Sequence, residues 1–142
     1  MDREIGFYLK KLFQTMEKKL NKDLENIDLT SMQAQVLIYL YKNKNNIINQ
    51  RDIERKFALT NPTVNGILNR LEKKGFVKRL VSHIDARNKE ISLTDKSISL
   101  INDMKKSAIK LENKMTLGIE KDELDIFYKV IKKMFNNVEG GV

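Results

Sequence analysis

Thr60-Asn-Pro-Thr-Val-Asn-Gly-Ile-Leu-Asn-Arg-Leu-Glu-Lys-Lys-Gly-Phe-Val77 is the stretch from which the fold of this chain can be argued. Its apolar residues recur at i, i+3, i+4 and i+7, which predicts a helix with one buried side. These residues are Val64, Ile67, Leu68 and Leu71. Either Thr60 or Asn61 can cap the start of this helix, and Pro62 suits its first turn. Gly75 supplies the left-handed residue that ends it.

The other side of this helix is polar. It carries Asn65, Gly66, Asn69, Arg70 and Lys73. Asparagine and arginine side chains read adenine and guanine edges in a DNA major groove, although an ordinary surface helix with a solvated polar side would show the same pattern.

The flanking segments favour the DNA-reading alternative. Residues 50–59 predict a short helix, and a turn of about three residues separates it from the next helix, which together make a helix-turn-helix. Residues 77–82 and 89–94 predict two strands, and 83–88 join them as a hairpin loop. A helix-turn-helix followed by such a hairpin, or wing, is typical of winged-helix DNA-binding domains.

These segments resemble the multiple antibiotic resistance regulator (MarR) family. The similar segments are Leu29-Thr-Ser-Met-Gln-Ala-Gln-Val-Leu, Asn61-Pro-Thr-Val, Leu68-Asn-Arg-Leu-Glu-Lys-Lys-Gly-Phe-Val and Asp85-Ala-Arg-Asn-Lys-Glu-Ile-Ser-Leu-Thr. The last is the most specific, because the wing of the family carries Asp-x-Arg just before its second strand. One position departs from the pattern: Ala58 stands where the family often has glycine, and a positive φ there would cost about 1 kcal/mol.

We therefore expect a mainly α (α+β) fold, with residues 1–142 forming a single MarR-type domain. Its DNA-binding lobe would be residues 30–93. That lobe would open with Thr30 and Gln33 as a capping box, and a short strand at Ile47-Ile48 would flank the wing. The apolar helix at 4–21 either packs on its own domain or forms a subunit interface, and we favour the interface. The resemblance implies that residues 1–22 and 95–138 form the dimerisation region of a homodimer.

Composition points to an anionic partner. The chain has 27 Lys and Arg against 19 Asp and Glu, for a net charge of +8, and residues 51–90 hold ten of these cations against five acids. Such clustering is the electrostatic footprint of double-stranded DNA binding. The absence of cysteine excludes disulfides and thiol-based sensing, and no apolar run reaches membrane-spanning length. We expect a cytoplasmic protein without membrane contact, and the Lys-, Asn- and Ile-rich composition suggests a bacterial source.

The predicted DNA contacts fall into two sets. In the recognition helix, the base edges would be read by Thr63, Asn65, Asn69 and Arg70, and the phosphates would be bound by Thr60, Asn61 and Lys73. In the wing, the phosphate contacts would be Lys78, Arg79 and Lys89. Arg87 near the hairpin tip would enter a narrow minor groove. The resemblance implies that Asp85 orients its guanidinium.

Catalytic and cofactor sites are not expected. The acids at 120–125 lack a base or nucleophile nearby, and one histidine, His83, without cysteines argues against a metal sensor. The resemblance implies a regulator, by default a repressor, that a small aromatic acid or phenol would release from DNA. The residues that could line a pocket for it are Tyr8, Phe13, Met16, Met32 and Tyr39, although Met and aromatic residues at helical spacing more often belong to the core. The alternative functions are a winged helix for protein–protein contact and a non-specific DNA-binding protein.

Overall fold

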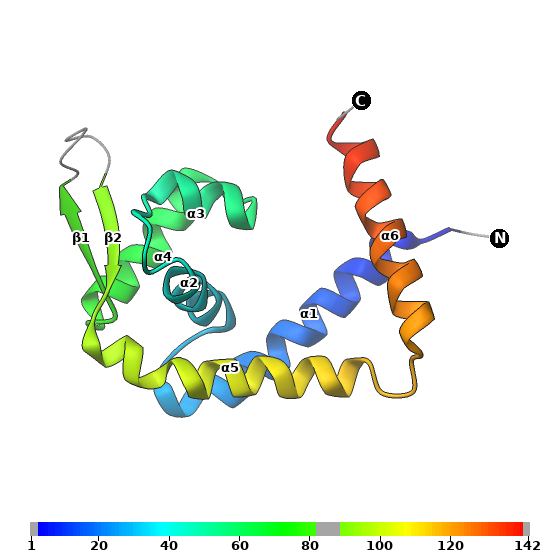
Figure 1. Ribbon diagram of the computed structural model, residues 1–142, viewed down its shortest axis with the longest axis horizontal. Coiled ribbons are helices and arrows are strands. Elements are labelled where there is room, and N and C mark those ends of the chain that lie inside the picture. The colour runs from blue at the N-terminus through cyan, green and yellow to red at the C-terminus, as the bar shows by residue number, and fades with distance from the viewer. Residues whose placement is uncertain (1–2, 82–88, 141–142) are drawn as a thin grey trace. The chain divides into compact units, whose positions relative to one another are not determined.

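The computed structural model describes residues 3–81 and 89–140, and within them the chain is mainly helical with one two-stranded antiparallel sheet (Figure 1). In chain order the elements are α1 (Ile5–Leu24), a 3-10 turn η1 (Glu25–Ile27), α2 (Ser31–Lys42), α3 (Gln50–Phe57), α4 (Asn61–Lys73), β1 (Val77–Val81), β2 (Lys89–Leu93), α5 (Asp95–Met115) and α6 (Lys121–Val138). A helix-turn-helix followed by two strands confirms the predicted winged-helix fold class.

Local capping decides where the helices of the lobe begin. Thr30 and Gln33 form the predicted capping box at the start of α2, with both hydrogen bonds 3.2 Å long. Asn49 and Asp52 form a second box at the start of α3, with bonds of 2.9 and 3.0 Å. Thr60, rather than Asn61, caps α4. Each box satisfies backbone N–H groups that lack a partner within the helix.

The turn between α3 and α4 requires a left-handed residue. Ala58 has φ 51° and ψ 47°, and the N–H of the next residue, Leu59, donates to the carbonyl of Glu54 at 3.0 Å. Ala58 thus has a positive φ at the position where the family often has glycine. The conformation costs an L-residue with a Cβ about 1 kcal/mol, so Ala58 is a strained point in the helix-turn-helix.

Gly75 ends α4 and turns the chain into the wing. Its φ is +80°, its N–H donates to Glu72 O at 3.0 Å, and the N–H of Phe76 donates to Leu71 O at 2.8 Å. This bond pattern is a Schellman motif, which satisfies the last carbonyls of the helix. Phe76, only 1% exposed, then enters the core directly before β1.

The apolar side of α4 lies at the centre of the core. Val64, Leu68 and Leu71 have no exposed surface, and Ile67 is 8% exposed. They belong to one buried cluster with residues of α2, α3, both strands and α5, including Leu37, Ile53, Val77, Ile91, Ile101 and Met104. Burying these side chains removes apolar surface from water and so holds the polar side of α4 outward.

The two strands pair antiparallel, from Val77 opposite Leu93 to Val81 opposite Lys89. The strand expected at Ile47-Ile48 is shorter than predicted. It is reduced to an isolated bridge between Asn49 and Glu90, beside which the N–H of Ile91 donates to Ile48 O at 2.8 Å. Asn49 already caps α3, so the chain turns into that helix before a second pair can form.

By its contacts the chain divides into two compact units, Met1–Leu111 and Glu112–Val142. The second contains α6, which begins with a capping contact in which the Glu120 N–H donates to the Glu123 carboxylate at 2.8 Å. Several large apolar side chains of α6 are exposed, among them Ile126, Phe127 and Phe135. Among the helices of the described ranges, none is long and apolar enough to cross a membrane.

Candidate nucleic-acid interface

The start of α4 is held by hydroxyl and amide contacts. The Thr60 hydroxyl accepts from the Thr63 N–H at 3.4 Å and lies 2.8 Å from the Thr63 hydroxyl. Asn61 connects this end of α4 to α3, because its amide donates to Glu54 Oε2 at 3.4 Å and its carbonyl accepts from the Gln50 amide at 3.5 Å. The first turn of α4 is therefore fixed against α3, as a helix-turn-helix requires.

The polar side of α4 forms a continuous exposed row. Its exposed members are Asn61, Thr63, Asn65, Asn69, Arg70 and Lys73, with Thr60 exposed at the cap. Gly66 is half-buried in the same row, and a Cβ placed there would lie 3.5 Å from Arg70 Nη1. All seven residues predicted on the recognition helix thus lie at the surface, along the length of α4 and at its cap. The row can present amide, hydroxyl and guanidinium groups to a groove.

Arg79 lies apart from the other predicted cations, against α4. Its side chain is only 8% exposed. Nη1 donates to Asn65 Oδ1 at 3.0 Å, and Nη2 donates to the Asn65 carbonyl at 3.3 Å and to Asn69 Oδ1. Nε lies 4.0 Å from the Glu72 carboxylate. The structure therefore joins a wing residue to two asparagines of the exposed row, Asn65 and Asn69.

The remaining wing residues divide between described and undescribed parts of the chain. Lys78 on β1 and Lys89 on β2 are exposed. Alternation along β1 explains why Lys78 is exposed while Arg79 faces α4, since neighbouring side chains of a strand point to opposite faces. Asp85 and Arg87, together with His83, lie outside the described residues.

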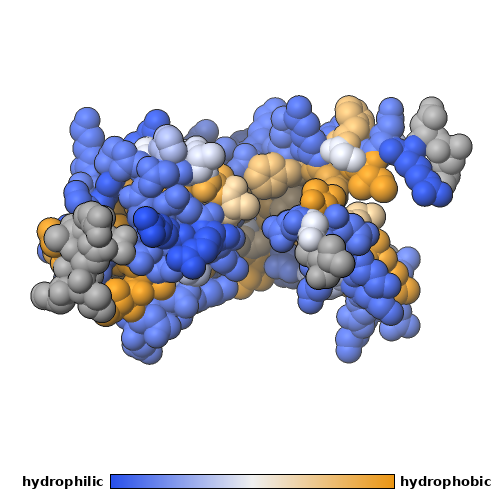
Figure 2. Space-filling model, turned by 90° about the horizontal axis from the view of Figure 1, so that it is seen from above, coloured by the Kyte–Doolittle hydropathy of each residue, from blue (hydrophilic) through white to orange (hydrophobic). Residues whose placement is uncertain are grey.

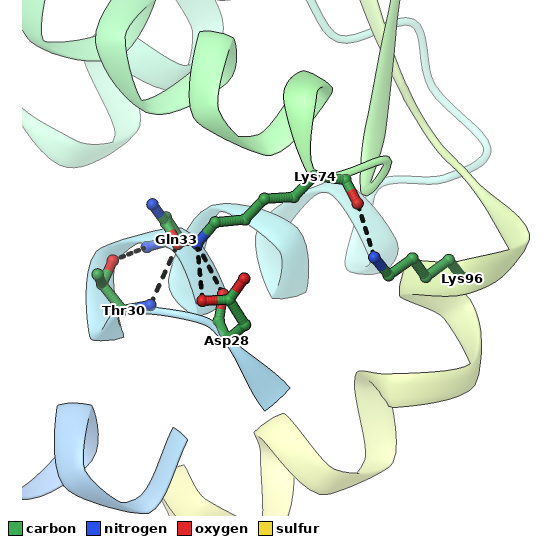
Figure 3. Close-up of polar contacts among 5 residues, drawn as sticks. All are labelled: Asp28, Thr30, Gln33, Lys74 and Lys96. Atoms are coloured by element: carbon green, nitrogen blue, oxygen red, sulfur yellow. Dashed lines mark hydrogen bonds and ion pairs between the residues drawn. The ribbon is translucent and has the colours of Figure 1, made fainter. Parts of the chain in front are cut away.

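A polar cluster behind α4 fastens its C-terminal end (Figure 3). Lys74 Nζ donates to Asp28 O at 2.7 Å and to Gln33 Oε1 at 3.3 Å, and it lies 3.6 Å from the Asp28 carboxylate. Lys96 Nζ donates to Lys74 O at 2.7 Å. A cation at a helix C-terminus also suits the negative end of the helix dipole. The cluster thus connects α4 to the segment before α2 and to the start of α5.

A buried hydroxyl adds to this attachment. Ser97 has no exposed surface, and its Oγ donates to Phe76 O at 2.6 Å. Thr94 supports the same turn, because its hydroxyl donates to Gly75 O at 2.6 Å. No sequence pattern singled out Ser97, Lys74 or Lys96, because each acts through a partner distant in the chain.

The described part of the chain offers no metal site and one cavity beside the wing. No group of three or more His, Asp or Glu side chains there could hold a metal ion. A cavity of about 280 Å³ lies between the end of α2, the wing strands and the start of α5, lined in part by Tyr41, Ile48, Leu80 and Ile98. None of the five residues suggested for an effector pocket lines this cavity.

Comparison with known proteins agrees with this arrangement. The MarR family model matches residues 27–87. MarR from Oenococcus oeni is 31% identical with a TM-score of 0.80, over 94% of this chain and 99% of that one. The S. aureus MepR–DNA complex gives a TM-score of 0.87 at 26% identity, over 94% and 95%. The HTH-type transcriptional regulator SarZ of Staphylococcus haemolyticus is 28% identical over 96% of this chain and 90% of its own.

Proposed function

This chain belongs to the MarR family of transcription regulators, and we propose that it is a cytoplasmic repressor that binds a pseudo-palindromic operator as a homodimer. Its relatives are transcription regulators and not enzymes. The observation that carries the proposal is the exposed polar row on α4, from Asn61 to Lys73, presented by a helix whose other side is buried in the core.

The contacts follow from the chemistry of the row. Thr63, Asn65, Asn69 and Arg70 would meet base edges in the major groove. Thr60, Asn61 and Lys73 would bind phosphates, with Lys78 and Lys89 of the wing extending the phosphate contact. Arg87 would enter the minor groove with Asp85 orienting it. Each phosphate contact would make binding weaker as salt concentration rises.

The second copy in the homodimer would pack against α1. That helix exposes several large apolar side chains: Ile5, Phe7, Tyr8, Leu9, Leu12 and Phe13, each between 41% and 67% exposed. Figure 2 shows hydrophobic residues at the surface of the molecule. MarR-family proteins are dimers, so another copy of this chain is the occupant we propose. Two-fold symmetry would then set two recognition helices about 34 Å apart, one helical turn of DNA.

Release from the operator would come from a small aromatic acid or phenol. Such an effector shifts the protein away from its DNA-binding arrangement only if it binds the two arrangements with different affinity. The support for an effector is the family resemblance. Titration with salicylate should raise the Kd for the operator, whereas an unchanged Kd across millimolar concentrations would remove this class of effector.

Selection from random DNA duplexes at about 150 mM salt tests the proposal. We expect recovery of an inverted repeat whose half-sites lie about one helical turn apart. If no sequence is enriched and DNA binding merely weakens as salt concentration rises, the protein is a non-specific DNA-binding protein. No DNA binding at all would support the protein–protein interaction module.

Variants then assign the contacts. Asn69→Ala and Arg87→Ala should leave the dimer intact and abolish operator binding, as measured by sedimentation and by fluorescence anisotropy. Asn102→Ala is a matched control, since Asn102 is also an exposed helical asparagine but lies on α5. Equal affinity of all three variants would contradict the assigned interface.

A further inference from the structure

The guanidinium of Arg79 binds residues of α4 and not solvent. Both terminal nitrogens donate to α4, at 3.0 Å to Asn65 Oδ1, at 3.3 Å to the Asn65 carbonyl, and to Asn69 Oδ1. Glu72 lies 4.0 Å from Nε and balances the charge. With 8% of the side chain exposed, the guanidinium could reach a phosphate only by leaving these partners.

These contacts determine which way the two amides point. An asparagine amide has an oxygen that accepts and a nitrogen that donates, whereas a guanidinium only donates. Only the oxygens of Asn65 and Asn69 can therefore face Arg79, which leaves each Nδ2 amino group directed away from it. Because the asparagines are four residues apart, they lie on one face of α4, and one arginine orients both.

We propose that Arg79 is a positioning residue that fixes the amides of Asn65 and Asn69 with their amino groups toward the DNA. This inference rests on the proposed operator binding. Amino groups held in that way donate to base acceptors, which in the major groove are guanine N7 and O6, thymine O4 and adenine N7. A free asparagine could rotate and accept as well. Arg79 thus sets the base preference of the recognition helix without touching a base.

The geometry of arginine is essential to this role. Its planar fork carries donors at fixed spacing, so one side chain can hold two amides at once. A lysine at position 79 would keep the positive charge but present a single ammonium on a flexible stem. The Arg79→Lys variant therefore keeps the positive charge but loses the ability to orient both amides, which separates the two effects.

The test compares Arg79→Lys and Arg79→Ala with Lys78→Ala, the neighbouring exposed cation. For each, operator affinity is measured against single-base variants of the selected site and across a salt series. We expect both Arg79 variants to lose about tenfold discrimination at one or more base pairs of each half-site. We also expect the salt dependence of Arg79→Lys to match that of the unsubstituted protein. Lys78→Ala should keep discrimination and lower the slope of log K against log salt by about 0.9.

The opposite pattern would overturn the proposal. If Arg79 binds a phosphate, Arg79→Lys will keep full discrimination and Arg79→Ala will behave like Lys78→Ala.

A measurement without DNA separates this inference from the proposed function. In nuclear magnetic resonance spectra of the unsubstituted protein, the Nη–H protons of Arg79 should exchange slowly with water. The side-chain amide signals of Asn65 and Asn69, assigned by their loss in alanine variants, should move in Arg79→Lys. Rapid exchange or unmoved amide signals would refute the positioning role even if the operator is bound. Slow exchange without a selected operator would instead refute the proposed function and leave the orientation intact.

Discussion

Replacing Gly66 and Gly75 by alanine should change stability in opposite directions, although the two glycines stand nine positions apart on the same helix and its cap. At Gly66 the backbone is helical, and an added Cβ would meet only Arg70 Nη1, at an ordinary 3.5 Å. Gly66→Ala should therefore stabilise the protein by about 0.5–1 kcal/mol, the cost of glycine within a helix. At Gly75 the nearest atom is Lys96 Cδ at 4.0 Å, but φ is +80°. Gly75→Ala should destabilise by about 1 kcal/mol.

Urea unfolding at one fixed protein concentration measures both changes, since the free energy falls linearly with denaturant. A gain of 1 kcal/mol corresponds to a rise in Tm of roughly 2–4 °C for a domain near this size. Because neither Cβ meets a close neighbour, a difference in sign isolates backbone conformation as the cause. Destabilisation by Gly66→Ala would refute the reasoning, since it would require a steric conflict that the 3.5 Å contact does not contain.

The same variant examines why glycine occupies the recognition helix. If α4 must approach the DNA backbone closely at Gly66, the alanine variant will be more stable and yet bind the operator more weakly. If Gly66 is a tolerated surface glycine, its affinity will equal that of the unsubstituted protein. Anisotropy titration decides between the two readings, with the stability gain showing that the variant is folded.

Three further changes follow from single contacts. Ala58→Gly should raise the unfolding free energy by up to about 1 kcal/mol by relieving the left-handed alanine, and thermal melting that shows a loss would contradict the strain at φ 51°. Ser97→Ala should lower it by about 1 kcal/mol, because the buried hydroxyl bond to Phe76 O is lost, and an unchanged urea midpoint would count against that bond. Phe7→Asp on α1 should shift sedimentation toward monomer, with Lys10→Asp as the exposed polar control; a persistent dimer would exclude α1 from the interface.

The features that sequence predicted best depend on residues three to five positions apart. Thr30 with Gln33, the Thr60 cap and the end of α4 at Gly75 all arise from bonds within one turn of the chain. The buried side of α4 follows from 3.6-residue periodicity alone. Residues close together in the sequence decide where a helix starts, where it ends and which of its sides is apolar. Tertiary structure was therefore not needed to predict these features.

The predictions that failed depend on contacts between residues far apart in the sequence. Ile47-Ile48 has the composition of a strand, but capping at Asn49 limits its pairing with the wing to one bridge. At the start of α5 the polar Ser97 is buried and donates to Phe76 O, whereas its apolar neighbour Ile98 is 48% exposed. Periodicity assigns a face to a helix, whereas the neighbour that covers the face decides which residues at its edge are buried.

The sequence by itself determined the winged-helix fold, the family and the exposed polar row of α4, because these depend on periodicity, capping residues and short motifs. Only the tertiary structure decided that Arg79 binds Asn65 and Asn69 and that Lys74 bonds to Asp28, 46 residues away. In the sequence Arg79 is one cation among several in a basic segment. Its role comes from the pairing of β1 with β2 beside α4, which turns that side chain toward the helix and its neighbour Lys78 toward solvent.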